Sequence, residues 1–171
     1  MNFKLIPIVA ALILSVPLGS AAKTLKFPKA KPQFSIVFPN DWKAEVTEGG
    51  IISAQPKGAA YAISIFPVQA NNANDAVEET LKEVDKRFTD IQPGEPVDFR
   101  NEKGIKFLER DFTGKDKGDA RTLAIVAFSI DSQNYFALFQ AGTPEADKKY
   151  TESVIGIVKS ITPLMKISGG D

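Results

Sequence analysis

The amino-acid sequence predicts an α+β fold in which a mostly antiparallel sheet carries one helix on each face, an α/β/α sandwich. Short segments with strand-like alternation run along the chain, and only two segments have the spacing of an amphipathic helix. In the second half, short polar turns separate the strands, which indicates antiparallel neighbours because parallel strands need crossovers of about a dozen residues or more. Two of these strands are apolar on both sides, so both sheet faces must be covered. The expected order of elements is ββββαββββα.

Four strands are expected before the first helix, and each ends at turn residues. Pro39 ends the first strand because it withholds a ladder N–H, and Asn40 and Asp41 then favour a turn. Gly49 and Gly50 make the second break, and a Pro-Lys-Gly sequence makes the third. The expected strands are FSIVF (34–38), residues 43–47, IISAQ (51–55) and AAYAISIFPV (59–68).

The first helix is expected over residues 75–88. Asp75 followed by Glu78 has the form of a capping box, in which the two side chains satisfy free backbone N–H groups. Apolar residues then recur at i, i+4, i+7 and i+11, so they line one face of a helix. That apolar face consists of Val77, Leu81, Val84 and Phe88.

The second half is expected to form a four-stranded meander after a loop over DIQPGEP (90–96). One strand breaks the alternation, because its apolar side changes to the acidic side chains of Glu109 and Asp111. We expect either a bulge near Leu108 or a strand that leaves the core for solvent. The expected strands are VDFRN (97–101), GIKFLERDFTG (104–114), ARTLAIVAFSID (120–131) and NYFALFQAG (134–142).

The second helix is expected within TPEADKKYTESVIGIVKSITPL (143–164). Thr143 can cap it, Pro144 suits the first helical position, and Glu145 favours the positive end of the helix. Pro163 marks its stop. The apolar stripe consists of Tyr150, Val154, Ile157, Val158 and Ile161.

The first 22 residues have the three parts of a secretory signal peptide. Lys4 precedes an apolar run from Leu5 to Leu18, which is shorter than the ~20 residues that a membrane-spanning helix needs, and small residues close it. We expect cleavage after Ala22 or Ala21 and therefore export to the periplasm or the outside of the cell. No later segment is apolar enough to span a membrane, and no cysteine follows the run to carry a lipid.

Removing residues 1–22 from the 171 leaves 149, which suits one domain with a core of its own. We expect a flexible basic leader over 23–32, the domain over 33–164 and a disordered tail over 165–171. One of the 21 basic residues lies in the removed segment, so 20 Lys and Arg stand against 21 Asp and Glu. This near-neutral balance predicts no basic surface for nucleic acid.

The chain contains no His and no Cys. This excludes Ser-His-Asp and Cys-His nucleophile pairs, the usual zinc sites and haem ligation by histidine. Within DFTGKDKGD (111–119), lysines alternate with the acidic residues, which predicts a polar hairpin tip rather than a metal loop. We therefore expect no cofactor, no metal site and no catalytic residue.

The stretch FSIVFPNDW (34–42) opens the predicted domain with the form F-S-I-x-F-P, a polar pair and then Trp42. This resembles the start of PsbP-like domains, a superfamily with the same order of elements. It includes the photosystem II protein PsbP, a Ran-binding import factor and DcrB-like exported bacterial proteins. The resemblance covers about residues 33–164 and implies a docking or accessory role rather than an enzyme. The photosystem and import roles are not carried over, because the leader indicates neither thylakoid targeting, nor a lipid anchor, nor a place in the nucleus.

The leading functional hypothesis is a non-catalytic exported module, monomeric or weakly oligomeric, that binds an envelope protein. Tyr61 and Tyr135 are candidate exposed aromatic contacts for such a partner. Trp42 is a third candidate contact, although we expect it mainly to pack at the edge of the core.

Two alternatives remain open. One is a carrier of a small ligand or lipid, with an apolar pocket between the sheet and a helix. The other is a hydrolase that uses only carboxylates, Glu109 with Asp111 on one strand face, although Arg110 and nearby lysines offer them ion-pair partners. The carrier's pocket would draw on Phe88, Phe99, Phe107, Phe112, Phe128, Phe136 and Phe139.

Overall fold

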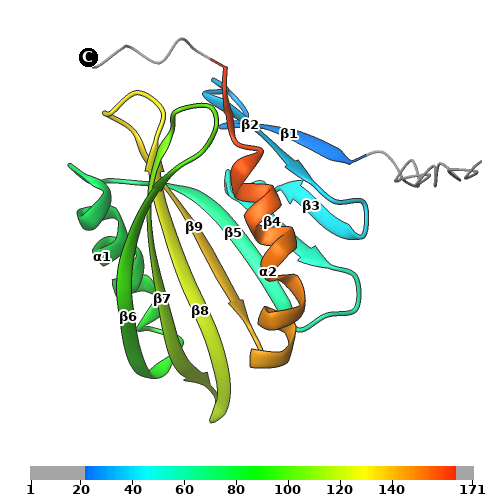
Figure 1. The fold of residues 1–171 in the computed structure, drawn as a ribbon, viewed down its shortest axis with the longest axis vertical. Coiled ribbons are helices and arrows are strands. Elements are labelled where there is room, and N and C mark those ends of the chain that lie inside the picture. The colour runs from blue at the N-terminus through cyan, green and yellow to red at the C-terminus, as the bar shows by residue number, and fades with distance from the viewer. Residues whose placement is uncertain (1–21, 165–171) are drawn as a thin grey trace, which may run out of the picture.

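Ten strands and two helices follow one another in residues 22–164, which are the residues that the computed structural model describes. Seven strands form one antiparallel sheet in the order β3-β4-β5-β9-β8-β7-β6, and three short strands form a second sheet in the order β1-β2-β10 (Figure 1). The elements are β1 (Lys23–Phe27), β2 (Phe34–Phe38), β3 (Trp42–Val46), β4 (Ile52–Pro56), β5 (Tyr61–Val68), α1 (Ala73–Val84), β6 (Thr89–Arg100), β7 (Lys106–Asp116), β8 (Asp119–Ser129), β9 (Tyr135–Gly142), α2 (Pro144–Lys159) and β10 (Thr162–Pro163).

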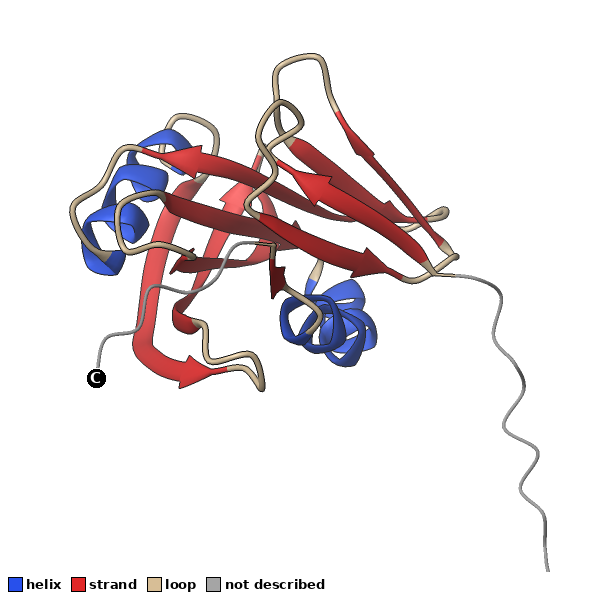
Figure 2. Cartoon of the chain, turned by 90° about the horizontal axis from the view of Figure 1, so that it is seen from above, coloured by secondary structure: helices blue, strands red, loops and turns tan. Residues whose placement is uncertain are grey.

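The two helices cover opposite faces of the large sheet (Figure 2). On one face, Val77 of α1 packs in a cluster with Leu123 of β8. On the other face, Ile157 of α2 shares a core with Phe128 of β8 and with Phe34 from the small sheet. Since β8 is apolar on both sides, both covers remove apolar surface from water. The expected antiparallel sheet with a helix on each face is confirmed.

The segment expected to be a flexible leader contains strand β1, so that prediction is wrong for residues 23–27. β1 pairs with β2 along its whole length, from Lys23 opposite Phe38 to Phe27 opposite Phe34. Phe27 is fully buried, while the lysines of the strand are exposed. This is the alternation of a strand with one buried face, which the neighbouring lysines and prolines obscured in the sequence.

Helix α1 begins and ends earlier than expected. Its N-cap is Asn72, whose side chain accepts a hydrogen bond from the backbone N–H of Asp75 at 2.9 Å. The capping box predicted at Asp75 and Glu78 is therefore wrong, because the asparagine three residues upstream caps the helix. The helix ends at Val84, and Phe88 reaches the core from the following turn.

Helix α2 begins as expected. The Thr143 side chain accepts a hydrogen bond from the backbone N–H of Ala146 at 3.2 Å, and Pro144 occupies the first turn. The helix ends at Lys159, and Pro163 lies in the short strand β10 beside β2 rather than at the helix terminus.

The expected loop over residues 90–96 is part of β6, so that prediction is wrong. The strand contains Pro93 and Pro96, and its register against β7 shifts twice, between residues 89 and 92 and between residues 93 and 96. β6 tolerates these prolines because it is an edge strand, whose outer side donates no ladder hydrogen bonds.

β7 contains no bulge at Leu108, because its pairing with β8 is unbroken from Phe107 to Asp116. The side of β7 that begins with Phe107 carries acidic residues further along because this part of the sheet face leaves the core. Of the two explanations for the broken alternation, the strand that emerges from the core is the one observed.

The predicted tail over 165–171 and the predicted signal peptide, apart from its last residue, lie outside the described residues. Within residues 22–164, neither helix is both long and apolar enough to cross a membrane.

Candidate functional site

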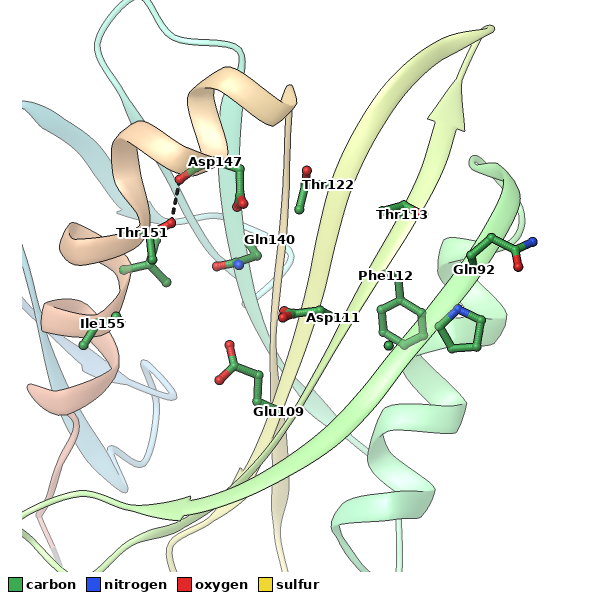
Figure 3. Close-up of a pocket in the computed structure, with 13 residues that line it drawn as sticks. Gln92, Glu109, Asp111, Phe112, Thr113, Thr122, Gln140, Asp147, Thr151 and Ile155 are labelled. Carbon is green, nitrogen blue, oxygen red and sulfur yellow. Dashed lines mark hydrogen bonds between the residues drawn. The ribbon is translucent and has the colours of Figure 1, made fainter.

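A half-open pocket of about 450 Å³ lies between α2 and the sheet face beneath it (Figure 3). Strands β6 to β9 line one side of the pocket, and α2 lines the other. The carboxylates of Glu109, Asp111 and Asp147 and the amide of Gln140 point into the space between them. The pocket therefore contains three acidic groups and an amide among its lining residues, where the carrier hypothesis expected an apolar lining.

Strand register brings the polar side chains of the sheet together. Asp111 of β7 pairs with Ala124 of β8, and Ala124 pairs with Gln140 of β9. Paired residues face the same side of a sheet, so Asp111 and Gln140 share the α2 face with only a small alanine between them. Glu109 lies two residues along β7 from Asp111, and its side chain points to the same face.

The first turns of α2 bring a third carboxylate over this row. Thr143 fixes where the helix begins, and Asp147 and Thr151 then lie one turn apart on the side facing the sheet. The Thr151 hydroxyl donates to the backbone carbonyl oxygen of Asp147 at 2.8 Å (Figure 3). An acidic residue in the first helical turn is favoured by the positive end of the helix, so Asp147 suits this position on local grounds as well.

The irregular part of β6 lies beside the pocket. The register shift between residues 93 and 96 falls opposite Asp111, which has no paired residue on β6. From the other sheet face, Arg110 donates through Nε to the carbonyl oxygen of Gly94 at 3.2 Å, and its Nη1 lies 3.3 Å from a carboxylate oxygen of Glu78 in α1. Arg110, one of the ion-pair partners that the sequence offered to Glu109 and Asp111, therefore pairs with Glu78 instead.

Burial raises the pKa of all three pocket carboxyl groups, Glu109, Asp111 and Asp147, above their ordinary values. For Glu109 and Asp147, the negative charge of Asp111 raises the pKa further, so Asp111 lies within electrostatic reach of both. Among residues 22–164, no Lys or Arg lines the pocket, and the ion pairs join other side chains. The protein environment therefore disfavours the charged forms of these carboxyl groups relative to water.

Gln140 adds an unsatisfied acceptor to these charges. Its side chain is 9% exposed, and its Oε1 atom meets no hydrogen-bond donor within the described residues. A buried polar atom left without a partner costs about 1–3 kcal/mol, so a hydrogen-bond donor that reached this oxygen would stabilise it. Figure 3 shows the amide directed toward the space between β7 and α2.

An aromatic cluster packs beside Asp147. The rings of Trp42, Tyr61 and Tyr150 meet with centroids 5.7–6.1 Å apart. A Cβ atom on Gly142 would lie 2.2 Å from Tyr61 Cδ2, so the missing side chain lets the tyrosine ring lie over β9. Burial, followed by the charge of Asp147, raises the pKa of Tyr61 well above its ordinary value. The neutral hydroxyl faces this carboxylate but does not meet it with hydrogen-bond geometry.

Two of the three predicted contact residues are core residues. Trp42 packs in the core as expected, and both Trp42 and Tyr61 are 3% exposed, so neither supplies an exposed aromatic surface. Tyr135 is half-buried near the beginning of β9, where it lines a separate polar pocket of about 740 Å³ together with Gln33. A role for Tyr135 in partner binding stays a prediction.

The phenylalanines proposed to line an apolar cavity mostly fill the core instead. Five of the seven are at most 4% exposed, and Phe99 and Phe139 are partly buried against the two core clusters. A lipid-sized apolar cavity lined by these rings is therefore not what this fold encloses. The five fully packed residues are Phe88, Phe107, Phe112, Phe128 and Phe136.

Sequence reasoning identified Glu109 and Asp111 but missed Gln140 and Asp147. Gln140 had a usable signal, because it is a polar residue on a strand that is otherwise apolar on both sides. For Asp147, the only signal in the sequence was its place in the first turn of α2, where an acidic residue is common.

The pocket carboxylates are spread apart, and two of them are not held by other side chains of residues 22–164. Within residues 22–164, no three Asp or Glu side chains lie where they could hold a metal ion together. In the same range, no side-chain hydrogen bond or ion pair fixes the carboxylate of Glu109 or Asp111. Catalytic carboxylates need such neighbours to hold them in a productive geometry.

No protein-family profile and no curated protein sequence is significantly similar to the chain. Solved structures are similar in fold. The cyanobacterial PsbP (CyanoP) of Synechocystis sp. PCC 6803 aligns with a TM-score of 0.58 and 12% identity, over 86% of this chain and 99% of its own. LpqN of Mycobacterium tuberculosis, described as involved in cell envelope biogenesis, aligns with a TM-score of 0.56 and 14% identity, over 84% of this chain and 92% of its own.

A third structure is a Pseudomonas aeruginosa protein of unknown function, PA94, described as a putative regulator. It aligns with a TM-score of 0.50 and 12% identity, over 86% of this chain and all of its own. These likenesses extend over nearly the whole described chain and show that its fold is PsbP-like, as the opening motif suggested.

Proposed function

We propose that this chain is an exported accessory domain, without catalytic activity, that binds an envelope protein through the pocket between α2 and the sheet. The observation that carries the proposal is the pocket itself. Three carboxylates and a buried amide face it, and the described chain supplies no cation to pair with them. A bound group that supplied hydrogen-bond donors and positive charge would satisfy the buried amide oxygen and pair with the carboxylates.

Two further points support export and an envelope role. The first 22 residues have the parts of a signal peptide, and strand β1 begins at Lys23, directly after the proposed cleavage point. One protein of similar fold, LpqN, is described as involved in cell envelope biogenesis. At 14% identity this likeness concerns the fold, so the envelope role is our inference for this chain.

A hydrolase is the less favoured reading of the same carboxylates. A carboxylate pair that cleaves a glycosidic bond needs one group held as a proton donor and the other as a base or nucleophile. Glu109 and Asp111 share a strand face, burial raises the pKa of both, and no side chain of residues 22–164 holds either carboxylate in a fixed acid or base position. We therefore propose binding.

A small-molecule carrier is the second candidate. The pocket volume of about 450 Å³ falls within the range of about 300–1,000 Å³ that small-molecule sites occupy. Because the lining is acidic, the cargo would be a polar cation rather than a lipid. Native mass spectrometry of the protein purified from its host would show such a cargo as a retained mass.

Site-specific photo-crosslinking in the native host tests the partner proposal. A photo-reactive residue replaces Ile155, which lines the pocket and is 39% exposed, or, as a control, Glu79 on α1 at the opposite sheet face. We expect one envelope protein to be crosslinked from position 155 and not from position 79. Equal products from both positions, or none from position 155, would contradict the proposal.

The same cells test export. We expect the protein in the exported fraction with an amino terminus at Lys23 or Ala22, measured by intact mass. A cytoplasmic protein that retains residues 1–22 would contradict it.

A further inference from the structure

The pocket between α2 and the sheet carries negative charge that nothing in the described chain balances. Glu109, Asp111 and Asp147 form no ion pair within residues 22–164. The nearest arginine in sequence, Arg110, is engaged on the other face of the sheet with Glu78. A bound cation would supply the missing charge, and an anion would be repelled.

The spacing of the acidic groups favours an extended organic cation over a metal ion. Asp111 and Gln140 lie two strands apart, about 10 Å by ordinary sheet spacing, and Glu109 lies about 7 Å along the strand from Asp111. A metal ion would need its oxygen ligands within about 2–2.6 Å. No three acidic side chains of the described chain meet that need.

The unpaired amide oxygen of Gln140 indicates which hydrogen-bond donors the cation must carry. Its Oε1 atom accepts hydrogen bonds and is buried away from water. A ligand that satisfies this oxygen together with carboxylates on both walls must present several N–H groups in different directions. An ammonium has three such donors, and a guanidinium has five.

The rim of the pocket adds an apolar strip. Val154 and Ile155 of α2 line the same pocket, and Ile155 is 39% exposed. Lysine and arginine side chains combine an apolar stem with a cationic head, and they lay the stem along apolar surface. We propose that the pocket binds a lysine or arginine side chain presented by the partner protein, an inference that rests on the proposed function and names the chemistry of its contact.

The electrostatics of the pocket carboxyl groups agree with a lysine or arginine side chain as the occupant. Burial and mutual repulsion oppose ionisation of the three carboxyl groups, and a cation between the two walls would relieve both effects. Charge-assisted hydrogen bonds to carboxylates are about twice as strong as neutral ones.

Titration of the full mature protein by NMR tests the inference with defined probes. The probes are capped pentapeptides with a central arginine or lysine between glycines, the same peptide with citrulline as the uncharged isostere of arginine, and spermidine as a free polyamine. We expect the arginine or lysine peptide to give saturable shifts at Glu109, Gln140 and Asp147, while the citrulline peptide gives none. If spermidine binds and neither cationic peptide does, the occupant is a free polyamine and the inference is wrong.

Two variants identify the groups responsible. The triple variant Glu109→Gln, Asp111→Asn, Asp147→Asn should weaken peptide binding by about tenfold or more. Gln140→Leu should also weaken binding while leaving stability equal or higher, because it removes an unpaired buried oxygen. If the role of Gln140 were purely structural, Gln140→Leu would instead lower stability.

A matched control removes three negative charges elsewhere. Glu79→Gln, Glu83→Gln, Asp119→Asn makes the same change in net charge at exposed ion pairs, and we expect it to leave the shifts unchanged. If this control weakens binding as much as the pocket variant does, attraction to overall charge explains the titration and the inference fails.

The crosslinking experiment and the titration test different claims, so one can fail while the other succeeds. If position 155 crosslinks one partner but the pocket triple variant crosslinks it equally well, the accessory function stands and the cationic contact is wrong. If the arginine peptide binds but position 155 crosslinks nothing in the host, the pocket chemistry stands and the protein-partner function is wrong.

Discussion

The sheet face beneath α2 has two ends that are built from the same strands, β7, β8 and β9, yet carry different side chains. At one end, Phe107, Phe128 and Phe136 lie across the three strands and are at most 2% exposed. At the other end, the corresponding places are taken by Asp111, Ala124 and Gln140, and the surface opens into the pocket.

What lies above the strands explains the difference. The small sheet covers the aromatic end, where Phe34 of β2 stacks edge-on against Phe128 and Phe136 with centroids 5.3 and 5.1 Å away. At the acidic end, α2 lies above the strands, and the register shift in the edge strand β6 leaves Asp111 without a paired residue on that strand. One sheet face thus combines an apolar half that packs in the core with a half whose polar groups line an open pocket.

Substitution in the aromatic end should have the largest effect on stability. Phe34→Ala removes a fully buried ring, and we expect the free energy of unfolding to fall by about 3–5 kcal/mol in chemical denaturation. Val97→Ala on the exposed edge strand is the matched control, with an expected change within about 0.5 kcal/mol. A small loss for Phe34→Ala would mean that the small sheet is not part of the core.

Gly142→Ala should have the next largest effect, because it lies at the boundary between the aromatic cluster and the pocket. The added Cβ would overlap Tyr61, so we expect a loss of about 1–3 kcal/mol and a change in the fluorescence of Trp42, the only tryptophan. Gly156→Ala is the control, since its Cβ would meet nothing within 4 Å in α2. That variant should gain up to about 1 kcal/mol from helix propensity.

Substitutions at the two helix caps distinguish an effect on stability from an effect on binding in the pocket. Thr143→Ala and Asn72→Ala should each cost about 1 kcal/mol, because each leaves a backbone N–H of the first turn unsatisfied. Only Thr143→Ala should also weaken binding of the arginine peptide, since it loosens the turn that carries Asp147. Equal effects of both variants on binding would show that general destabilisation is the cause.

Neutralising a pocket carboxylate should have the smallest effect, and it should be stabilising. The raised pKa values of Glu109 and Asp147 mean that the native state binds protons more tightly than the unfolded chain. The free energy of unfolding therefore falls as pH rises from about 4 through these raised values. Glu109→Gln or Asp147→Asn should flatten this fall and gain a few tenths of a kcal/mol at pH 7, the groups being partly exposed.

Asp116, further along β7, contributes to the pH dependence of stability with the opposite sign. The hydrogen bond from Arg87 lowers the pKa of Asp116, so its contribution to stability is present at neutral pH and is lost as pH falls through the lowered value. Asp116→Asn should therefore destabilise at pH 7 where the pocket variants stabilise. Urea denaturation across pH 3–7 compares them, and a shared sign would contradict this account of the pocket.

Local patterns in the sequence were sufficient for most of the secondary structure. Thr143 and Pro144 marked the start of α2, and the two apolar sides of β8 required a cover on each sheet face. The wrong predictions concern segments in which local signals conflict. The lysines and prolines near β1 indicated a flexible leader. The prolines of residues 90–96 indicated a loop, although an edge strand tolerates proline.

The sequence by itself determined the alternation along each strand, the two amphipathic helices and the place of Glu109 and Asp111 on one strand face, because these depend on spacings of a few residues. Only the tertiary structure decided that Gln140 and Asp147 join them, that Arg110 is engaged elsewhere and that Trp42 and Tyr61 are buried. Those outcomes depend on strand register and on how α2 lies across the sheet. Both are set by packing between segments far apart in the chain, and no short stretch of sequence records them.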